Sequence, residues 1–195
     1  ESGGATDFED SSGFENDGSC AGSACPGTSV EGVLGTALDF DGDDDAVRAD
    51  GVANDVAGGA YSVGGFFRLT GDKGPHPTLF DFSTPGGWFR AELNATNYES
   101  RKAQLWYYDP GQDWRVYGDG WLEWDRWHHV MLVVEKDGDG HVYLDGEEVI
   151  TFTTTTLPQS EDRFTVGHGP GYSTPFQGQI DEFVAYGFAL SPEEV

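Results

Sequence analysis

Residues 127–146 constrain the fold of this chain more than any other stretch, because they carry two apolar runs joined by polar turns. The first run, 127–134, is rich in β-branched and aromatic residues, and the second, 141–144, ends at Asp145-Gly146. Such runs separated by Gly and Asp turns predict a β-hairpin that leads into another hairpin. Apolar residues fall on both faces of 127–134, which predicts a central strand covered on each side.

The remainder of the chain repeats this pattern on a smaller scale. It holds 29 Gly and 9 Pro in 195 residues, and no long window has helical periodicity. Runs with period two alternate with Gly, Asp and Pro clusters, which favours a sandwich over an α/β fold. The sequence predicts an all-β fold, a two-sheet antiparallel sandwich of roughly a dozen strands, in one domain that spans 1–195. The main expected strands are 36–40, 60–69, 78–82, 88–93, 103–108, 114–117, 127–134, 141–144, 148–152, 163–167 and 179–186.

The charge of the chain is extreme, with 35 Asp and Glu against 10 Lys and Arg, a formal net charge of −25. Self-repulsion at this charge destabilises the fold in dilute buffer, and salt or bound cations relieve it. Nucleic acid and anionic membrane surfaces are therefore not expected partners. The acidity is spread along the chain and Lys is scarce, which favours adaptation to high salt for most of it, with calcium sites within the same acidic background.

Several short features point to an exported protein. Cys20 and Cys25 lie in one Gly/Ser/Ala-rich loop, and the pair predicts a short disulfide loop. Asn94-Ala95-Thr96 is a glycosylation sequon. No run has the length and hydrophobicity of a membrane span or a signal peptide, and the chain begins at Glu1 without a Met. We expect one module of a longer extracellular or cell-surface protein, with no direct membrane insertion.

Four pieces of the sequence together resemble a known family. They are 37–42, 61–66, the pair 127–130 and 142–146, and the C-terminal set 164–167, 176–183 and 189–195. This pattern resembles the laminin-G-like branch of the concanavalin A-like lectin and glucanase jelly rolls. The resemblance implies two antiparallel sheets in a jelly roll, and carbohydrate or protein ligands, often bound with calcium, in secreted and cell-surface proteins.

Acidic loops are the candidate calcium ligands. Asp41 and Asp43 belong to a run of carboxylates that repel one another unless they are solvated or bridged, and calcium takes six to eight oxygen ligands. Asp10 and Asp17 offer oxygens in a polar loop, and Asp181 on the last strand could approach both loops. The alternatives are Asx turns for the loop at 10–17 and, for Asp181, a buried acid that accepts bonds from backbone N–H groups.

Aromatic residues provide the candidate ligand site. Trp106 and Tyr108 share one face of a strand, and Trp114 lies on a neighbouring segment beside Asp113 and Arg115. If the rings are exposed, they can stack on a sugar while the polar groups bond its hydroxyls. The alternative is that the rings fill the core of the sandwich.

Catalysis is not expected. Glycosidases of related fold place two carboxylates on one strand face as nucleophile and acid, but the nearest stretch here, 179–184, has Gln179 at the first position and Phe183 or Val184 at the last. His128 and His129 point to opposite faces, so they cannot chelate one ion together, and we expect both to be structural.

The sequence therefore predicts a non-enzymatic extracellular module that recognises glycan with calcium-ordered loops. The main rival is a structural or adhesive subunit that contacts other protein subunits in a surface filament or layer, and a third possibility is an atypical glycosidase. An exposed aromatic platform would favour sugar, and a flat apolar patch or an open strand edge would favour assembly.

Overall fold

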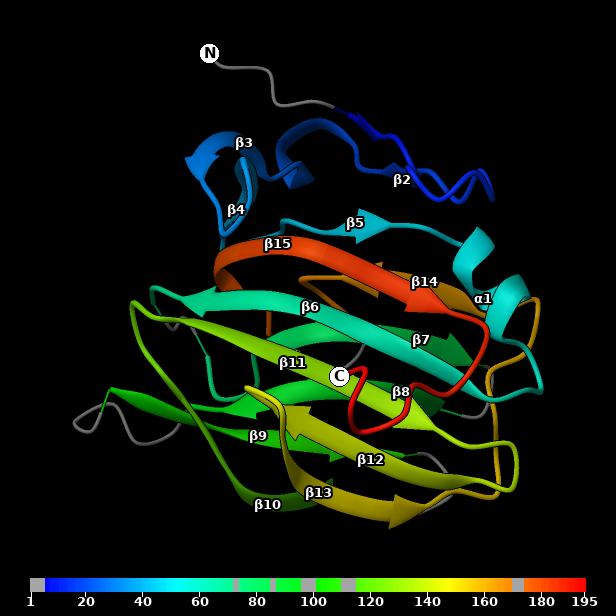
Figure 1. The fold of residues 1–195 in the computed structure, drawn as a ribbon. Coiled ribbons are helices and arrows are strands. Elements are labelled where there is room, and N and C mark those ends of the chain that lie inside the picture. Colours follow the sequence, from blue (N-terminus) through cyan, green and yellow to red (C-terminus); the bar gives the residue numbers. More distant parts are fainter. Residues whose placement is uncertain (1–5, 72–73, 85–86, 96–100, 110–114, 170–173) are drawn as a thin grey trace.

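The computed structural model contains two antiparallel β-sheets packed face to face, as the sequence predicts (Figure 1). It describes residues 6–71, 74–84, 87–95, 101–109, 115–169 and 174–195. Within these residues one sheet has eight strands in the order β1-β2-β5-β14-β7-β8-β9-β10, and the other has seven in the order β13-β12-β11-β6-β15-β4-β3. Among the described residues, no helix has the length and apolar character needed to cross a membrane.

The strands of the two sheets interleave along the sequence. The eight-stranded sheet contains β1 (Asp7–Phe8), β2 (Gly18–Ser19), β5 (Val47–Arg48), β7 (Thr78–Thr84), β8 (Gly87–Asn94), β9 (Lys102–Tyr108), β10 (Arg115–Glu123) and β14 (Arg163–Val166). The seven-stranded sheet contains β3 (Gly27–Glu31), β4 (Thr36–Asp41), β6 (Tyr61–Leu69), β11 (Trp127–Val134), β12 (Asp139–Leu144), β13 (Glu147–Thr153) and β15 (Gln177–Tyr186). The helices are the 3-10 turn η1 (Gly22–Ala24) and α1 (Gly51–Val56).

The double hairpin predicted from residues 127–146 is confirmed. Strand β11 lies between β12 and β6, and its register runs from Val130 opposite Leu144 to Val134 opposite Gly140. Asp145 and Gly146, with φ of 52° and 81°, form the two-residue turn that joins β12 to β13. Positive φ at both central residues matches the turn type whose twist suits a hairpin. Both faces of β11 are covered, one by the sandwich core and the other by the C-terminal segment.

His128 ties this hairpin to the other sheet. Its Nδ1 lies 2.8 Å from the Asp145 carboxylate, and its Nε2 accepts a 2.9 Å bond from the backbone N–H of Glu123 at the end of β10. Because Nε2 is an acceptor, the proton of the neutral imidazole lies on Nδ1 and is donated to Asp145. His128 is thus a buried structural residue, as expected, and His129 points to the opposite face.

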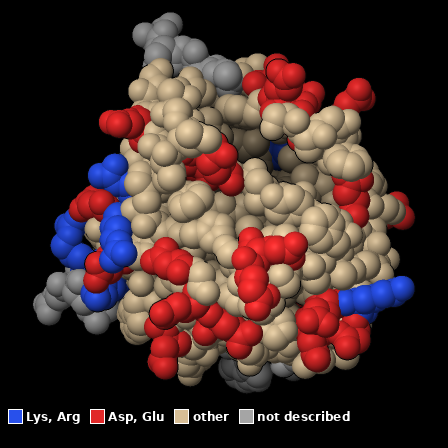
Figure 2. All heavy atoms as spheres, in the orientation of Figure 1, with Lys and Arg blue, Asp and Glu red and all other residues tan. Residues whose placement is uncertain are grey.

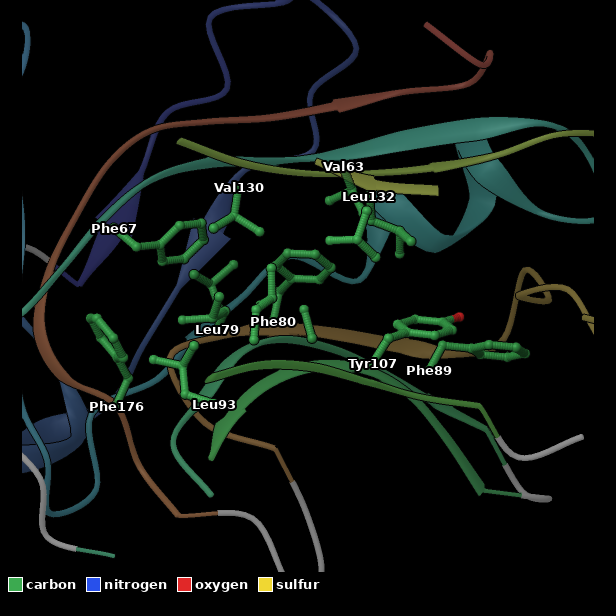
Figure 3. Close-up of a cluster of buried hydrophobic side chains, with 14 of the residues drawn as sticks. Val63, Phe67, Leu79, Phe80, Phe89, Leu93, Tyr107, Val130, Leu132 and Phe176 are labelled. Atoms are coloured by element: carbon green, nitrogen blue, oxygen red, sulfur yellow. The ribbon is translucent and has the colours of Figure 1, made fainter. Parts of the chain in front are cut away.

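The core between the sheets is rich in aromatic rings (Figure 3). Phe183 of β15 contacts rings from both sheets, with centroids 6.4 Å from Phe67, 5.8 Å from Phe80 and 5.7 Å from Phe164. The contacts to Phe67 and Phe80 are edge-to-face, the geometry that the ring quadrupoles favour. These rings therefore hold the centre of one sheet against the centre of the other.

A β-bulge places Phe183 in the core. The pairing of β15 with β6 shifts between Asp181 and Val184, and Glu182 has a positive φ of 45°. Ile180 is buried, so strict alternation would turn Glu182 inward and Phe183 outward. The extra residue of the bulge keeps the carboxylate of Glu182 in solvent and turns the ring inward.

The structure differs from the sequence prediction in several strands and one helix. Strand β10 continues to Glu123, whereas the pattern at 114–117 predicted a strand that ends at Tyr117. The short strands β1, β2, β3 and β5 and the helix α1 were not expected. Strands of two residues and a helix of six carry too few residues for a periodicity to be visible, and the five-residue β3 holds a single apolar residue, Val30.

The disulfide between Cys20 and Cys25 is present, as predicted. Its loop packs on the acidic turn that follows β4. Ser23 Oγ donates a 3.0 Å bond to the Asp44 carboxylate, and the backbone N–H of Ala46 donates to the carbonyl of Ala24. The disulfide loop therefore supports the turn that carries the densest run of carboxylates.

Replacing Phe183 with Ala tests the role of this ring. We expect Phe183→Ala to lower the free energy of unfolding by about 3 kcal/mol, because it removes contacts to both sheets and leaves a cavity. Phe188→Ala, at a side chain that is 53% exposed, is the matched control and should change stability by less than about 0.5 kcal/mol. Urea denaturation of both variants measures the free energy of unfolding. Equal losses in the two variants would contradict the contribution of Phe183 to packing between the sheets.

Candidate functional site

The outer face of the eight-stranded sheet carries the strongest concentration of aromatic and polar side chains away from the core. In β8, Phe89, Ala91 and Leu93 face the core, so Arg90 and Glu92 lie on the outer face. In β9, Leu105 and Tyr107 face the core, and Trp106 and Tyr108 alternate with them. We call this surface the polar–aromatic face. Its members are His76, Asp81, Trp88, Arg90, Glu92, Gln104, Trp106, Tyr108 and Tyr117.

Rings on the polar–aromatic face contact one another across the strands. Trp106 is stacked against Tyr117 of β10 with centroids 5.6 Å apart, and the ring of His76 lies 5.7 Å from Trp106 on its other side. Trp88 and Tyr108 form a second pair at 6.1 Å. Tyr117 is 62% exposed, and Trp106 and Tyr108 are half-buried, so the rings present apolar surface to solvent.

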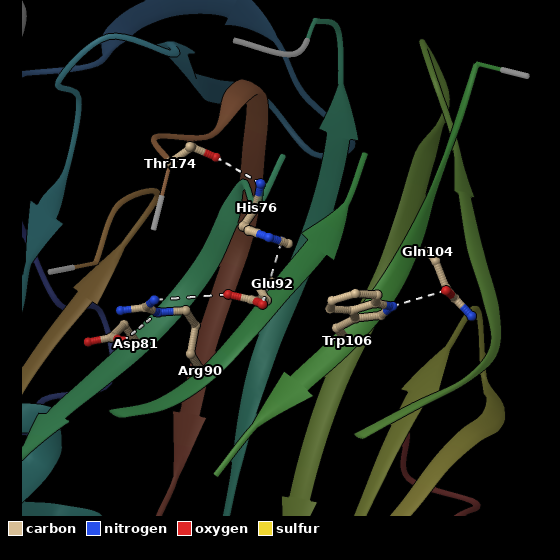
Figure 4. Close-up of polar contacts among 7 residues, drawn as sticks. All are labelled: His76, Asp81, Arg90, Glu92, Gln104, Trp106 and Thr174. Carbon is tan, nitrogen blue, oxygen red and sulfur yellow. Dashed lines mark hydrogen bonds and ion pairs between the residues drawn. The ribbon is translucent and has the colours of Figure 1, made fainter. Parts of the chain in front are cut away.

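Hydrogen bonds orient the ring of Trp106. Its Nε1 donates a 3.0 Å bond to Gln104 Oε1, and Gln104 Nε2 donates a 2.8 Å bond to the carbonyl of Gly118 (Figure 4). The indole is thus held by β9 and β10 together. A ring fixed in this way loses little conformational entropy when a ligand stacks on it.

A buried ionic network lies beside the rings. Arg90 Nε donates a 2.8 Å bond to Asp81, and Arg90 Nη1 lies 3.9 Å from Glu92, whose carboxylate is also 3.9 Å from His76 Nδ1 (Figure 4). Asp81, Arg90 and Glu92 are 0%, 3% and 1% exposed. Burial raises the pKa of Asp81, and the Arg90 guanidinium and the Ser83 hydroxyl oppose that rise. Charges buried to this extent persist only when they are paired, so the network fixes the geometry of this sheet.

Neighbouring loops close over the network. A Cβ at Gly169 would lie 2.9 Å from Arg90 Nη2 and 3.0 Å from the Asp81 carboxylate, so only glycine lets the backbone approach this closely. The backbone N–H of Thr174 donates to the carbonyl of His76, and the backbone N–H of His76 donates to Thr174 Oγ1. The ion pairs are therefore covered, and the rings of Trp88, Trp106, Tyr108 and Tyr117 are more accessible than the ion pairs.

The structure places two of the five sequence-predicted ligand residues here. Trp106 and Tyr108 share the outer face as predicted, and the alternative that they fill the core is wrong, since Tyr107 occupies the core instead. Asp113 and Trp114 lie outside the described residues. The backbone of Arg115 pairs with Tyr108, and its side chain is not described.

Sequence reasoning missed His76, Arg90 and Glu92. The alternation of Trp88, Arg90 and Glu92 with apolar Phe89, Ala91 and Leu93 was a usable signal for the two strand residues. No local pattern indicates His76, because it reaches the face from a loop.

The predicted calcium ligands fall into separate places. Gln177 pairs with Asp41 and Ile180 with Leu38, so Asp181 lies beyond the opposite end of this strand pair from Asp41. The Asp181 carboxylate accepts bonds from the backbone N–H groups of Leu34 (2.9 Å) and Glu182 (3.0 Å), which is the role given above as its alternative. Asp181 does line one cavity together with Asp10.

The loop at residues 10–17 is organised by its own carboxylates. The Asp10 side chain accepts bonds from Ser12 Oγ and from the backbone N–H groups of Ser12 and Asn16, and these bonds lower its pKa. Asp17 Oδ1 accepts a 2.8 Å bond from the backbone N–H of Asp10. These are the Asx-type turns that the sequence left open as an alternative.

The turn after β4 brings three carboxylates together. Oxygens of Asp41, Asp44 and Asp45 lie within 4.8 Å of one another, whereas Asp43 contributes its backbone N–H to Asp41 Oδ1. Asp45 is 3% exposed and accepts a 2.7 Å bond from the backbone N–H of Asp41. Burial, with repulsion from Asp41 and Asp44, raises the pKa of Asp45 to about 6. Such a set of hard oxygen donors fits a calcium ion.

Asn94 of the sequon is the last residue of β8 and is half-buried opposite Gln104. Thr96 lies outside the described residues. Glycosylation at Asn94 stays a prediction.

Comparison with known proteins identifies the family. Residues 41–195 match the Laminin_G_3 family model of the concanavalin A-like lectin/glucanases superfamily. The chain belongs to this superfamily. This fold occurs in binding modules and in glycosidases alike. A comparison with curated proteins gives no match.

Solved structures of similar fold include two proteins solved with bound sugars and a binding domain. Domain 4 of AbnA, an extracellular arabinanase of Geobacillus stearothermophilus solved with arabinotriose, is 23% identical with a TM-score of 0.65, covering 85% of this chain and 77% of that chain. The binding domain of Paraclostridial Mosquitocidal Protein 1 gives 13% identity and a TM-score of 0.72, with 95% and 47% coverage. Trypanosoma rangeli sialidase in complex with sialic acid is 17% identical with a TM-score of 0.68, and the match covers 99% of this chain and 30% of that chain. This chain spans less than half of the toxin and sialidase chains, and at these identities the likeness is one of fold.

The raised pKa of Asp45 predicts a pH effect on stability. In the folded protein the Asp45 carboxyl stays protonated up to about pH 6, whereas in the unfolded chain it loses its proton near its ordinary pKa of 3.8. Stability from this group is therefore present below about pH 4 and falls by roughly 3 kcal/mol as the pH rises through 6. In EDTA, the Asp45→Asn variant should not show this decrease in stability with pH, whereas Asp137→Asn, in an exposed turn, should show it as the wild type does. Urea denaturation from pH 4 to 7 measures the difference, and parallel curves for all three proteins would contradict it.

Proposed function

We propose that this domain is a non-catalytic module that binds glycan on the polar–aromatic face, within a surface or secreted protein. The observation that carries the proposal is the stack of Trp106 against Tyr117, held by Gln104 beside the buried Arg90–Asp81 pair. Rings fixed on a sheet and exposed at one side suit the apolar faces of a pyranose or furanose. The sugar-bound domain among the similar folds supports this ligand class.

A binding role fits the carboxylates better than a catalytic one. Glycoside hydrolysis needs one carboxyl that donates a proton and another that acts as nucleophile or base. Asp81 is held by Arg90 and Ser83, and Asp181 accepts two backbone N–H bonds, so both are occupied by structural partners. We therefore propose recognition without bond cleavage.

Replacing Trp106 tests the ligand site. The wild-type domain is first screened against an array of neutral and acidic oligosaccharides, and the tightest ligand is then titrated by calorimetry. We expect Trp106→Ala to weaken binding at least tenfold, because stacking area and ring orientation are both lost. Trp127→Ala, at a half-buried Trp on the other sheet, is the matched control and should keep the affinity within twofold. Equal losses in both variants, or no sugar bound by the wild type, would refute the assignment.

We also propose that calcium orders the acidic turn. Asp41, Asp44 and Asp45 would hold the ion, whose charge would offset the repulsion among the three carboxylates. Asp10, Asp17, Asp43 and Asp181 stay predicted ligands for further ions, although their carboxylates or backbones already serve the turns described above.

A thermal melt at fixed ionic strength tests the calcium proposal. At about 100 times its Kd, calcium should stabilise the fold by about 2.7 kcal/mol, equivalent to roughly 5–10 °C in Tm. Asp44→Asn should abolish most of the difference between calcium and EDTA, and Asp137→Asn should retain it. If total salt alone moves the midpoint, the calcium proposal fails and the acidity is an adaptation to the solvent.

A further inference from the structure

The open edge of β15 borders a cavity that the glycan site does not use. Strand β4 pairs with β15 only from Gln177 to Ile180. Beyond it, in the described structure, Asp181 and Val184–Tyr186 pair on one side alone, with β6, and Glu182 and Phe183 form the bulge between them. A cavity of about 720 Å³ runs along this edge. Every residue from Ile180 to Phe188 lines it. Successive residues of a strand point to opposite faces, so this continuous lining indicates that the cavity follows the edge of β15.

The opposite wall of the cavity is formed by the N-terminal segment and α1. Phe8, Phe14, Val47, Val52 and Val166 contribute apolar surface there and at the floor. Figure 2 shows this face hollowed below the N-terminal segment. The apolar floor reaches the sandwich core between the two sheets, because Val47, Val166 and Ile180 are core residues.

Charge at the cavity has one sign. Glu9, Asp10, Asp55, Asp181 and Glu182 line it, and no Lys or Arg is among its lining residues. Acidic side chains and a bulge at an open edge discourage pairing with a strand of like charge. A second copy of this chain, with a net charge of −25, is such a partner and is disfavoured. The same carboxylates attract a strand that carries Lys or Arg.

We propose that this cavity binds an extended basic peptide, which adds to the free edge of β15 as a further strand. Backbone groups of the peptide pair with the edge of residues 181–186, a length of about 20 Å, apart from the N–H of Glu182, which is bonded to the Asp181 carboxylate. Alternate apolar side chains of the peptide enter the cavity, and alternate Lys or Arg side chains face Glu9, Asp55 and Glu182. The site is separate from the polar–aromatic face, so it stands whether or not glycan binds there.

A set of synthetic peptides tests the proposal on the full chain, in EDTA and 0.15 M salt. The probe is a fluorescent, end-capped hexapeptide of alternating Lys and Val, compared with its Glu/Val counterpart. Two further probes carry N-methyl groups on the odd or on the even residues. Since alternate N–H groups of a strand face opposite edges, an added strand needs only one of these sets. We expect one methylated peptide to lose at least tenfold in affinity and the other to bind within twofold of the parent.

Charge-reversed variants locate the site. Glu9→Lys/Glu182→Lys should weaken binding of the Lys/Val peptide at least tenfold. Glu135→Lys/Glu147→Lys, which makes the same charge change at exposed positions away from the cavity, should leave it within twofold. Hydrogen exchange should show new protection at residues 181–186 when the peptide is added.

Four outcomes of the peptide experiments overturn the proposal, and dimerisation would be a fifth. They are no binding of the Lys/Val peptide at 1 mM, equal binding of the Glu/Val peptide, equal binding of both methylated peptides, and equal losses in the two double variants. Concentration-dependent dimerisation of the wild type that Glu182→Lys abolishes would make a second copy the occupant and would also overturn it.

Discussion

The packing of Phe183 between the sheets is the interaction on which the rest of this structure depends. The ring touches Phe67 on the central strand of one sheet and Phe80 and Phe164 on adjacent strands of the other. Its inward direction comes from the bulge at Asp181–Val184, which inserts Glu182 without burying a carboxylate. The same bulge sends Val184 outward, where it packs against the cluster of Met131, Val133 and Tyr143. One irregularity in the backbone therefore serves both faces of the seven-stranded sheet.

The outer faces of the two sheets meet solvent in different ways. The C-terminal segment covers part of the seven-stranded sheet, since Ala189, Leu190 and Val195 pack on its outer cluster (Figure 1). Ser62 holds this segment, accepting a bond from the backbone N–H of Leu190 and donating one to the carbonyl of Phe188. On the eight-stranded sheet, rings and a buried ionic network take the place of such a cover. That contrast is why we propose the polar–aromatic face, and not the face of β11, as the ligand surface.

The net charge of the chain bears on each of the three sites proposed for it. A net charge of −25 favours cations, salt and basic partners, and it disfavours contacts between copies of this chain. Around the aromatic rings, however, Arg90 pairs with Asp81 and lies 3.9 Å from Glu92, so part of the acidity there is offset inside the sheet. At the edge of β15 no Lys or Arg among the described residues lines the cavity, so the proposed attraction for a cationic partner is not offset there.

The sequence by itself determined the strands of the core and the class of the fold. The double hairpin at residues 127–146, the disulfide and the placement of Trp106 and Tyr108 on one strand face follow from turn residues and from period two, which act over a few neighbouring positions. The tertiary structure decided that this face lies away from the core. The tertiary structure alone decided the bulge at Glu182, the reach of His76 to the aromatic stack and the grouping of Asp45 with Asp41 and Asp44. It also separated Asp181 from Asp41, although both lie on one pair of strands, because register sets which residues meet across a sheet. Alternation indicates which way a side chain points, but only the packing of distant strands fixes what it meets there.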